Sequence, residues 1–277
     1  MDDILLFIEK DKRGAFMKIG FIGVGHMGSS LARAIKGYPD TFLYFNDIDN
    51  EKALALKEEI TNSDVKSFNE VVGLVDYLFI GVKPNDANEV YKQIKDINDR
   101  VIIISMVAGK TISDISGFIT NPIIRILPNT PVAIKSGLTL YNHSSNVNKE
   151  QLDTFISFMK ETGELVKVKE DKINAISVVT GSAPAYLDYF IDALIKSLEK
   201  EGIDKKEATY YTLMMSLGTI KLDLQSNKSP LELGKEVCSP NGSTIEGVNV
   251  LLNRDLYAIV EEAFQATLKK NNKMRKD

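Results

Sequence analysis

The fold of this 277-residue chain is decided by one stretch, Lys18-Ile19-Gly20-Phe21-Ile22-Gly23-Val24-Gly25-His26-Met27-Gly28. Its first half is a short apolar run that predicts a buried strand, and residues 29–35 behind it have helical character. A G-x-G-x-x-G pattern between a strand and a helix predicts a dinucleotide site. Gly23 permits the tight turn, Gly25 lets the backbone approach a pyrophosphate, and Gly28 lets helix and strand pack closely. The cofactor contacts predicted in this loop are Gly23, Val24, Gly25, His26, Met27 and Gly28.

A second strand, predicted over 41–45, leads into an acidic position. Asp47 lies 19 residues after Gly28 (47 − 28), where an acidic residue accepts hydrogen bonds from the adenosine ribose. A carboxylate there also repels a 2′-phosphate, so it favours NADH over NADPH. The alternative is that Asp47 or Asp49 only begins the helix predicted over 51–60. The cofactor contacts predicted here are Asn46 and Asp47.

Three more apolar, β-branched runs, at 76–82, 101–105 and 123–127, continue the alternation of strands and helices. Such runs are typical of strands buried on both faces of a parallel sheet, which predicts an α/β fold with a Rossmann-type domain. Residues 136–141 and 164–168 are expected as later edge strands. Ligands of such sheets bind at the carboxyl ends of the strands. The cofactor contacts predicted at these ends are Gly81, Val82, Lys83, Pro84, Met106, Val107 and Ala108.

Helical patterns replace strands in the second half of the chain. We predict helices over 172–180, 183–200, 205–225 and 245–270. Aliphatic and methionine positions in these helices indicate core or subunit interface, and an all-helical part of this size favours oligomerisation. The predicted domains are an N-terminal extension (1–16), a Rossmann-type dinucleotide-binding domain (17–168) and a helical dimerisation and substrate domain (169–277).

Composition restricts the classes of function. A net charge of −4 gives no broad basic surface for nucleic acid, and no apolar run is long enough for a membrane span. The single cysteine, Cys238, excludes an intramolecular disulfide. With only two histidines, His26 and His143, no metal site is expected. We therefore expect a soluble, cytoplasmic protein with a small-molecule substrate.

The hexapeptide Ser239-Pro240-Asn241-Gly242-Ser243-Thr244 is the second informative stretch. It combines a Pro-Asn-Gly turn signal with hydroxyl residues directly before an apolar run of helical spacing. Such a turn aims backbone N–H groups and hydroxyls at one point, which suits a small carboxylate. The alternative is a helix cap without a ligand.

Together these motifs resemble the pyrroline-5-carboxylate reductase family from Met17 nearly to the C-terminus. The matching blocks are Gly23–Gly28, Val82–Pro84, Arg125–Pro131, Gly181–Tyr186 and Val237–Thr244. The resemblance implies a Rossmann-type domain, a helical domain that interlocks in a homodimer, and possible rings of dimers such as a decamer. It also implies NAD(P)H-dependent reduction of L-1-pyrroline-5-carboxylate to L-proline, the last step of proline biosynthesis, with Thr244 bonding the ring nitrogen as the catalytic group. The substrate residues that it implies are Glu170, Glu236, Ser239, Gly242, Ser243 and Thr244.

The chain departs from the family pattern at a few positions. Glycine is more usual where Asn241 stands, and an acidic residue where Lys235 stands; an asparagine often seen at Phe68 is found one residue later, at Asn69. Two alternatives remain at this point. A β-hydroxyacid dehydrogenase would carry a lysine after its central glycine motif, but residues 182–192 hold none. A non-catalytic dinucleotide-binding relative would have lost the hydroxyl loop.

Overall fold

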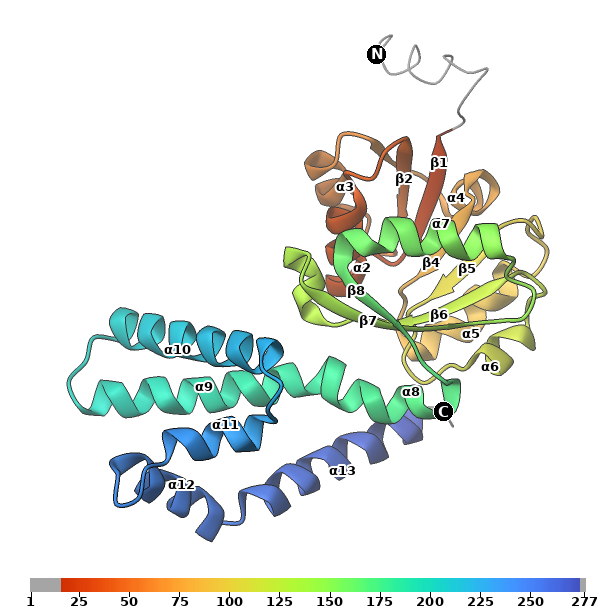
Figure 1. The fold of residues 1–277 in the computed structure, drawn as a ribbon. Coiled ribbons are helices and arrows are strands. Elements are labelled where there is room, and N and C mark those ends of the chain that lie inside the picture. The colour runs from red at the N-terminus through yellow and green to blue at the C-terminus, as the bar shows by residue number, and fades with distance from the viewer. Residues whose placement is uncertain (1–15, 275–277) are drawn as a thin grey trace. The chain divides into compact units, whose positions relative to one another are not determined.

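The computed structural model describes residues 16–274, which form two compact units (Figure 1). The first contains the described residues up to Gly181 together with those from Leu268 onward, and the second is Ser182–Thr267. The predicted extension, 1–16, lies outside the described part except for its last residue. The division between the two units falls after Gly181. The boundary predicted at residue 169 separates functions rather than compact units, and it stays a prediction.

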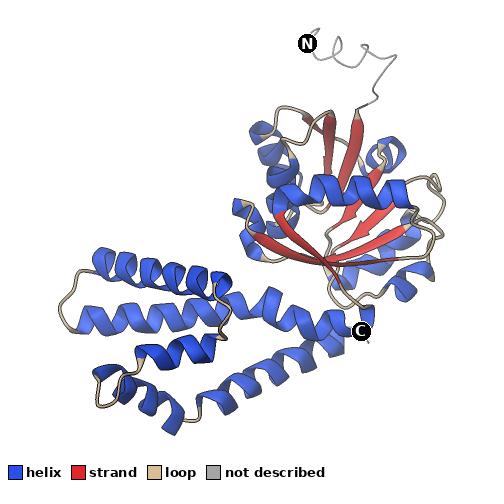
Figure 2. Cartoon of the chain, in the orientation of Figure 1, coloured by secondary structure: helices blue, strands red, loops and turns tan. Residues whose placement is uncertain are grey.

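All strands belong to the first unit (Figure 2). They form one sheet in the order β3-β2-β1-β4-β5-β6-β7-β8, and neighbours are parallel except for β6 and β7. The predicted α/β fold class is confirmed. The short β3 was not predicted, and β7, expected at an edge, lies between β6 and β8. The strands are β1 (Met17–Ile22), β2 (Thr41–Asn46), β3 (Ser63–Val65), β4 (Tyr77–Ile80), β5 (Ile102–Ser105), β6 (Ile123–Leu127), β7 (Gly137–His143) and β8 (Gly163–Lys167).

Helices cover both faces of the sheet, and alternate residues of the central strands enter two separate cores. In β4, Phe79 packs into the core with α2 (His26–Ile35), α3 (Asn50–Glu59) and α7 (Lys149–Met159). Its neighbours Leu78 and Ile80 pack into the opposite core. That core includes α4 (Phe68–Leu74), α5 (Pro84–Gln93) and α6 (Ile112–Ser116). Burial on both faces explains why these strands are continuous apolar runs rather than alternating ones.

The first unit also holds short helical segments after β6, α7 and β8. They are the 3-10 helices η1 (Thr130–Ile134) and η2 (Lys160–Thr162), and the α-helix α8 (Glu170–Ser177). A π-helical turn, η3 (Val178–Ser182), connects α8 to α9 (Ala183–Lys200). Pro184, in the first turn of α9, has no N–H to bond the carbonyl four residues earlier, so the backbone widens there.

The second unit is helical throughout. After α9 it contains α10 (Lys205–Gln225), α11 (Pro230–Val237), α12 (Ser243–Asn253) and the larger part of α13 (Leu256–Met274). α9 and α10 match the predicted bounds, and α11 was not predicted. The single helix expected over 245–270 is wrong, because Asp255 interrupts it with a left-handed φ of 58°. Its Oδ1 then accepts a hydrogen bond from the Ala258 N–H, 3.3 Å away, in the first turn of α13.

Candidate active site

The glycine loop after β1 has the geometry of a dinucleotide site. Gly23 has a φ of 91°, and a Cβ there would lie 2.8 Å from the carbonyl carbon of Gly81. A Cβ on Gly28 would lie 2.4 Å from the Gly23 oxygen, so this glycine allows α2 to approach the loop. A Cβ on Gly25 would meet no atom within 4 Å. The open space at Gly25 is therefore available to a ligand that approaches the backbone.

The N-terminus of α2 offers this ligand hydrogen-bond donors. Gly25 is the N-cap residue, and no side chain caps the first turn. Gly25 and His26 are exposed. Uncapped N–H groups and the positive end of the helix dipole favour a phosphate at such a position. The residues of the loop therefore fit the pyrophosphate of a dinucleotide.

The glycine loop lies at the switch point of the sheet, where β1 is flanked by β2 and β4. The Gly81 N–H donates to the Ile22 oxygen at 2.8 Å, and the Met106 N–H donates to the Ile80 oxygen at 3.1 Å. A Cβ on Gly81 would lie 3.3 Å from the sulfur of Met106 and 3.0 Å from the Gly23 oxygen. The structure thus brings together the predicted residues at the ends of β1, β4 and β5, where ligands of open α/β sheets bind.

The Asp47 carboxylate is hydrogen-bonded to the backbone of the glycine loop. Its Oδ2 accepts a hydrogen bond from the Val24 N–H at 2.8 Å, and its Oδ1 accepts one from the Asp49 N–H at 2.9 Å. Asp49 is in turn paired with Lys52 at 3.0 Å. Because each carboxylate oxygen can accept a second hydrogen bond, Asp47 can still receive a ribose hydroxyl. Its negative charge is held beside the loop in either case.

The other residues predicted to contact the cofactor differ in whether their side chains are exposed. Val24 is 3% and Val107 is 1% exposed, so only their backbones can face a ligand. The Asn46 amide donates to the Lys66 oxygen at 3.0 Å and holds the ends of β2 and β3 together. Lys83 is exposed, at the N-cap of α5 with Pro84 behind it.

The predicted substrate loop lies in the second unit and forms a tight turn. The Gly242 N–H donates to the Ser239 oxygen at 3.0 Å. Asn241 has a φ of 60°, which the third residue of a type II turn requires after a proline. Asparagine is among the non-glycine residues that tolerate this conformation best, which accounts for the departure from glycine.

Gly242, rather than a hydroxyl residue, is the N-cap of α12, and no side chain caps this helix. Thr244 is exposed, and its hydroxyl makes no hydrogen bond to any residue of 16–274. The hexapeptide therefore begins the helix through the backbone of Gly242, and the Thr244 side chain does not cap it. Two backbone N–H groups of the first turn, those of Ser243 and Thr244, lie beside this free hydroxyl.

The two glutamates implied by the resemblance are already paired and belong to different units. Glu236, in α11, forms an ion pair with Lys228. Glu170 begins α8 in the first unit and is bonded to Arg125. Cys238, directly before the substrate loop, is half-buried.

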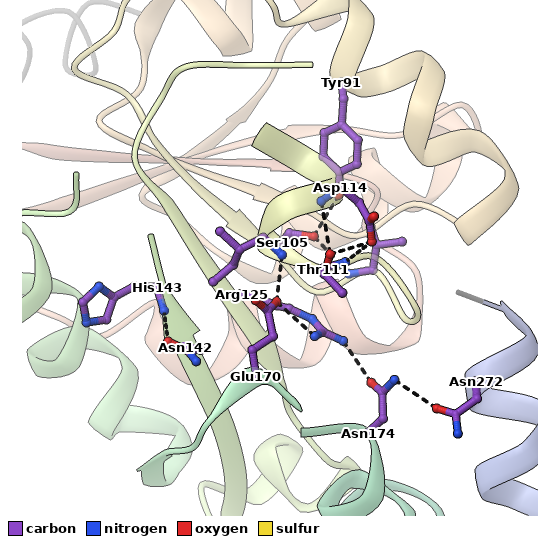
Figure 3. Close-up of polar contacts among 12 residues, drawn as sticks. Tyr91, Ser105, Thr111, Asp114, Arg125, Asn142, His143, Glu170, Asn174 and Asn272 are labelled. Atoms are coloured by element: carbon purple, nitrogen blue, oxygen red, sulfur yellow. Dashed lines mark hydrogen bonds and ion pairs between the residues drawn. The ribbon is translucent and has the colours of Figure 1, made fainter. Parts of the chain in front are cut away.

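Arg125 forms a polar cluster with side chains of α8 (Figure 3), and no motif of the sequence predicted a role for it. It lies in β6, is 1% exposed, and directs its guanidinium towards α8. Nη1 lies 3.2 Å from Glu170 Oε1, and Nη2 lies 3.2 Å from Asn174 Oδ1. The signal in the sequence was a charge inside the apolar run 123–127, because buried charges are rare unless they are paired.

Comparison with known proteins agrees with this geometry. A family model described as pyrroline-5-carboxylate reductase dimerisation matches residues 170–274, and one described as NADP oxidoreductase, coenzyme F420-dependent, matches 18–109. The pyrroline-5-carboxylate reductase of Staphylococcus saprophyticus is 30% identical over 261 residues, which cover 91% of this chain and 96% of the relative. The chain belongs to the pyrroline-5-carboxylate reductase family. Pyrroline-5-carboxylate reductase 2 of Bacillus subtilis is 29% identical over 264 residues, which cover 93% of this chain and 95% of the relative.

Solved structures of the family share the fold. The Plasmodium falciparum pyrroline carboxylate reductase, solved with NADP bound, has a TM-score of 0.85 at 26% identity and covers 95% of this chain and 100% of that one. The Streptococcus pyogenes 1-pyrroline-5-carboxylate reductase has a TM-score of 0.86 at 28% identity, with 93% and 98% covered. The predicted family, the enzyme class and NAD(P) binding are confirmed, and the β-hydroxyacid dehydrogenase alternative is set aside.

The dimerisation model supports a homodimer of pyrroline-5-carboxylate reductase type, and α10 has a matching surface. Its large apolar side chains are at least 44% exposed and extend along the helix. They are Tyr210, Tyr211, Leu213, Met214, Met215, Leu217, Ile220, Leu222 and Leu224. Within residues 16–274, no helix has the length and apolar character to cross a bilayer, and no three metal-ligating side chains come together.

Proposed function

We propose that this chain reduces L-1-pyrroline-5-carboxylate to L-proline, with the substrate held at the start of α12. The observation that carries the proposal is this uncapped helix start, where the free Thr244 hydroxyl lies beside unsatisfied backbone N–H groups. A helix of 11 residues also contributes the positive end of its dipole. These features suit a ligand that carries both a carboxylate and a ring nitrogen.

The substrate carboxylate binds the N–H groups of Ser243 and Thr244. The Gly242 N–H is not available, because it donates to the Ser239 oxygen. Gly242 instead lets the turn close tightly, since a Cβ there would lie 2.6 Å from the Ser239 hydroxyl and 3.1 Å from the Ser239 carbonyl oxygen. Ser239 and Gly242 thus shape the substrate loop, whereas Ser243 and Thr244 contact the ligand.

The Thr244 hydroxyl hydrogen-bonds the ring nitrogen and helps to place a proton on it. When bound, NAD(P)H supplies the hydride that the C=N carbon accepts. The protein therefore acts mainly by orientation, because a protonated imine is already electrophilic. Cofactor contacts come from the predicted residues of 17–168 and substrate contacts from 169–277, which we keep as the functional domains.

NADH is the preferred cofactor in this proposal. The Asp47 carboxylate beside the glycine loop repels a 2′-phosphate, and the nearby ammonium of Lys52 is already paired with Asp49. Lys66, near the end of β2, is likewise paired with Asp64 at 3.0 Å. Replacing Asp47 by serine should therefore shift the ratio of kcat/KM values towards NADPH by about tenfold, the equivalent of one charge interaction.

The test is steady-state oxidation of NADH and of NADPH with L-1-pyrroline-5-carboxylate, with proline as the product measured. We expect turnover with both and a higher kcat/KM with NADH. A higher value with NADPH would contradict the use made of Asp47 without affecting the reaction itself. No proline with either cofactor would contradict the proposed function and favour the non-catalytic relative.

Assembly of the homodimers into a larger ring, such as a decamer, is a further part of the proposal. It rests on the resemblance of the helical domain to its family. Sedimentation velocity of the purified protein measures it directly, and a single species with the mass of a dimer would contradict it.

A further inference from the structure

The loop between β5 and α6 is held at both ends by buried polar groups. This loop, 106–111, is called the cofactor loop below because it carries three of the residues assigned to the cofactor. At its start, the hydroxyls of Ser105 and Tyr91 are 2.8 Å apart, and both residues are at most 1% exposed. Burial raises the pKa of Tyr91 to about 12, so this phenol stays neutral and hydrogen-bonded. The hydrogen bond between Tyr91 and Ser105 is therefore the first anchor of the loop, and it involves no charged group.

The second anchor is the Glu170 carboxylate. Its Oε1 accepts a hydrogen bond from the Ile112 N–H, 2.7 Å away, at the first residue of α6. Thr111, directly before it, forms a reciprocal capping box with Asp114, with distances of 2.8 and 3.1 Å. The end of the loop is also buried, since Lys110 and Thr111 are each 7% exposed. A carboxylate from α8 thus fixes the point at which the loop ends.

Arg125 keeps this carboxylate in place. Its guanidinium contacts the same oxygen, Glu170 Oε1, that accepts from Ile112. The guanidinium also contacts Asn174, which lies one helical turn further along α8 and is bonded to Asn272 at 3.4 Å. An arginine that is 1% exposed and reaches two residues of one helix fixes that helix against β6. Charge-assisted hydrogen bonds of this kind are about twice as strong as neutral ones.

We propose that Glu170 and Arg125 are positioning residues for the cofactor loop, and that Glu170 acts on cofactor binding instead of contacting the imine substrate. The inference rests on the proposed function for the identity of the two ligands. It replaces the role that the family resemblance implied for Glu170. The geometry supports this role, because one oxygen of Glu170 contacts both Arg125 of β6 and the Ile112 N–H, the first N–H after the loop.

The test compares cofactor affinity with substrate KM in Glu170→Gln. The amide can still accept from Ile112, but it removes the negative charge that Arg125 contacts on α8. We expect the Kd of the preferred dinucleotide, followed by its fluorescence, to rise about tenfold, as for the loss of one charge-assisted hydrogen bond. The KM for L-1-pyrroline-5-carboxylate at saturating cofactor should change by less than about twofold. Amide hydrogen exchange over 106–116 in the cofactor-free protein should become faster.

The control is Glu161→Gln, which removes the carboxylate of an exposed ion pair with Lys135 in the same unit. It should leave all three quantities unchanged. Arg125→Lys keeps the charge but loses the second contact, so its Kd should lie between those of wild type and Glu170→Gln. Should Glu170→Gln fail to fold, Arg125→Lys supplies the same comparison.

Two results would overturn the inference. One is a raised substrate KM with an unchanged cofactor Kd, which would place Glu170 against the substrate. The other is a Kd and an exchange rate equal to those of Glu161→Gln. The cofactor Kd and the exchange rate are measured without turnover, so a failure of the proposed reaction would not be mistaken for a failure of this inference.

Discussion

At the scale of single residues, Thr244 is the position on which the proposed chemistry depends. Its hydroxyl is exposed and has no partner among the residues that the structure describes. Thr244→Ala should therefore change the free energy of unfolding by less than about 0.5 kcal/mol, as at other exposed sites. We expect kcat/KM to fall by about a hundredfold, the usual contribution of a positioned proton donor. Thr244→Ser, which keeps the hydroxyl, is the matched control, and wild-type kinetics in the alanine variant would refute the assignment.

Asn241 supports a second prediction, on backbone conformation. With a φ of 60°, an alanine at this position costs about 1 kcal/mol, whereas glycine adopts the conformation freely. Asn241→Gly should keep the wild-type kcat/KM, and Asn241→Ala should raise the KM for the imine because the turn relaxes. Steady-state kinetics of both variants check this. Equal kinetics for the two would show that the turn is not needed for substrate binding.

The sequence predicted residues whose role is local and missed those whose role depends on tertiary contacts. The glycines of the loop and Asp47 follow from spacing alone, because neighbouring elements fix their positions. Arg125 belongs to a recognised block, but its partners on α8, Glu170 and Asn174, are 45 and 49 residues away in the chain. The free hydroxyl of Thr244 likewise depends on Gly242 being the cap, which spacing does not decide.

At the scale of elements, the contact between the glycine loop and α2 separates packing from ligand binding. Gly28→Ala would place a Cβ 2.4 Å from the Gly23 oxygen, so we expect a loss of about 1–3 kcal/mol in stability. Gly25→Ala meets no atom within 4 Å and has an ordinary φ of −61°, so its stability should stay within about 1 kcal/mol of wild type.

The Gly25→Ala variant is expected to lose affinity for the dinucleotide without losing stability. Gly25→Ala should fold normally and still raise the Kd of the dinucleotide at least tenfold, because its Cβ occupies the space for the pyrophosphate. Thermal unfolding and fluorescence titration measure the two effects on the same samples. A Gly25→Ala protein with wild-type affinity would mean that the pyrophosphate binds elsewhere.

Most strands and the long helices could be predicted because each has a pattern that its own residues determine. Apolar β-branched runs became strands buried on both faces, and α9 and α10 have their expected bounds. Three features could not be predicted from the spacing of apolar residues. Asp255 interrupts an otherwise continuous apolar pattern by adopting a left-handed conformation, Pro184 widens the turn before it, and β3 has only three residues.

At the scale of the whole molecule, the two units obtain their stability differently. The first encloses two apolar cores around its sheet. In the second, only Ile195, Ala208 and Thr212 are buried, while large apolar side chains of α10 are exposed. A unit with so little core of its own gains stability from a second copy of the chain, in agreement with the dimerisation model.

Met214 provides the test of this dependence. Its side chain is 50% exposed in the middle of α10, so a carboxylate there would be buried without a partner when two copies associate. We expect Met214→Asp to weaken the dimer by about 3 kcal/mol or more and to lower the Tm in a concentration-dependent way. Lys206→Asp, at the start of the same helix, is the charge-changing control. Sedimentation equilibrium measures the association, and an equally tight dimer in both variants would show that α10 does not form the interface.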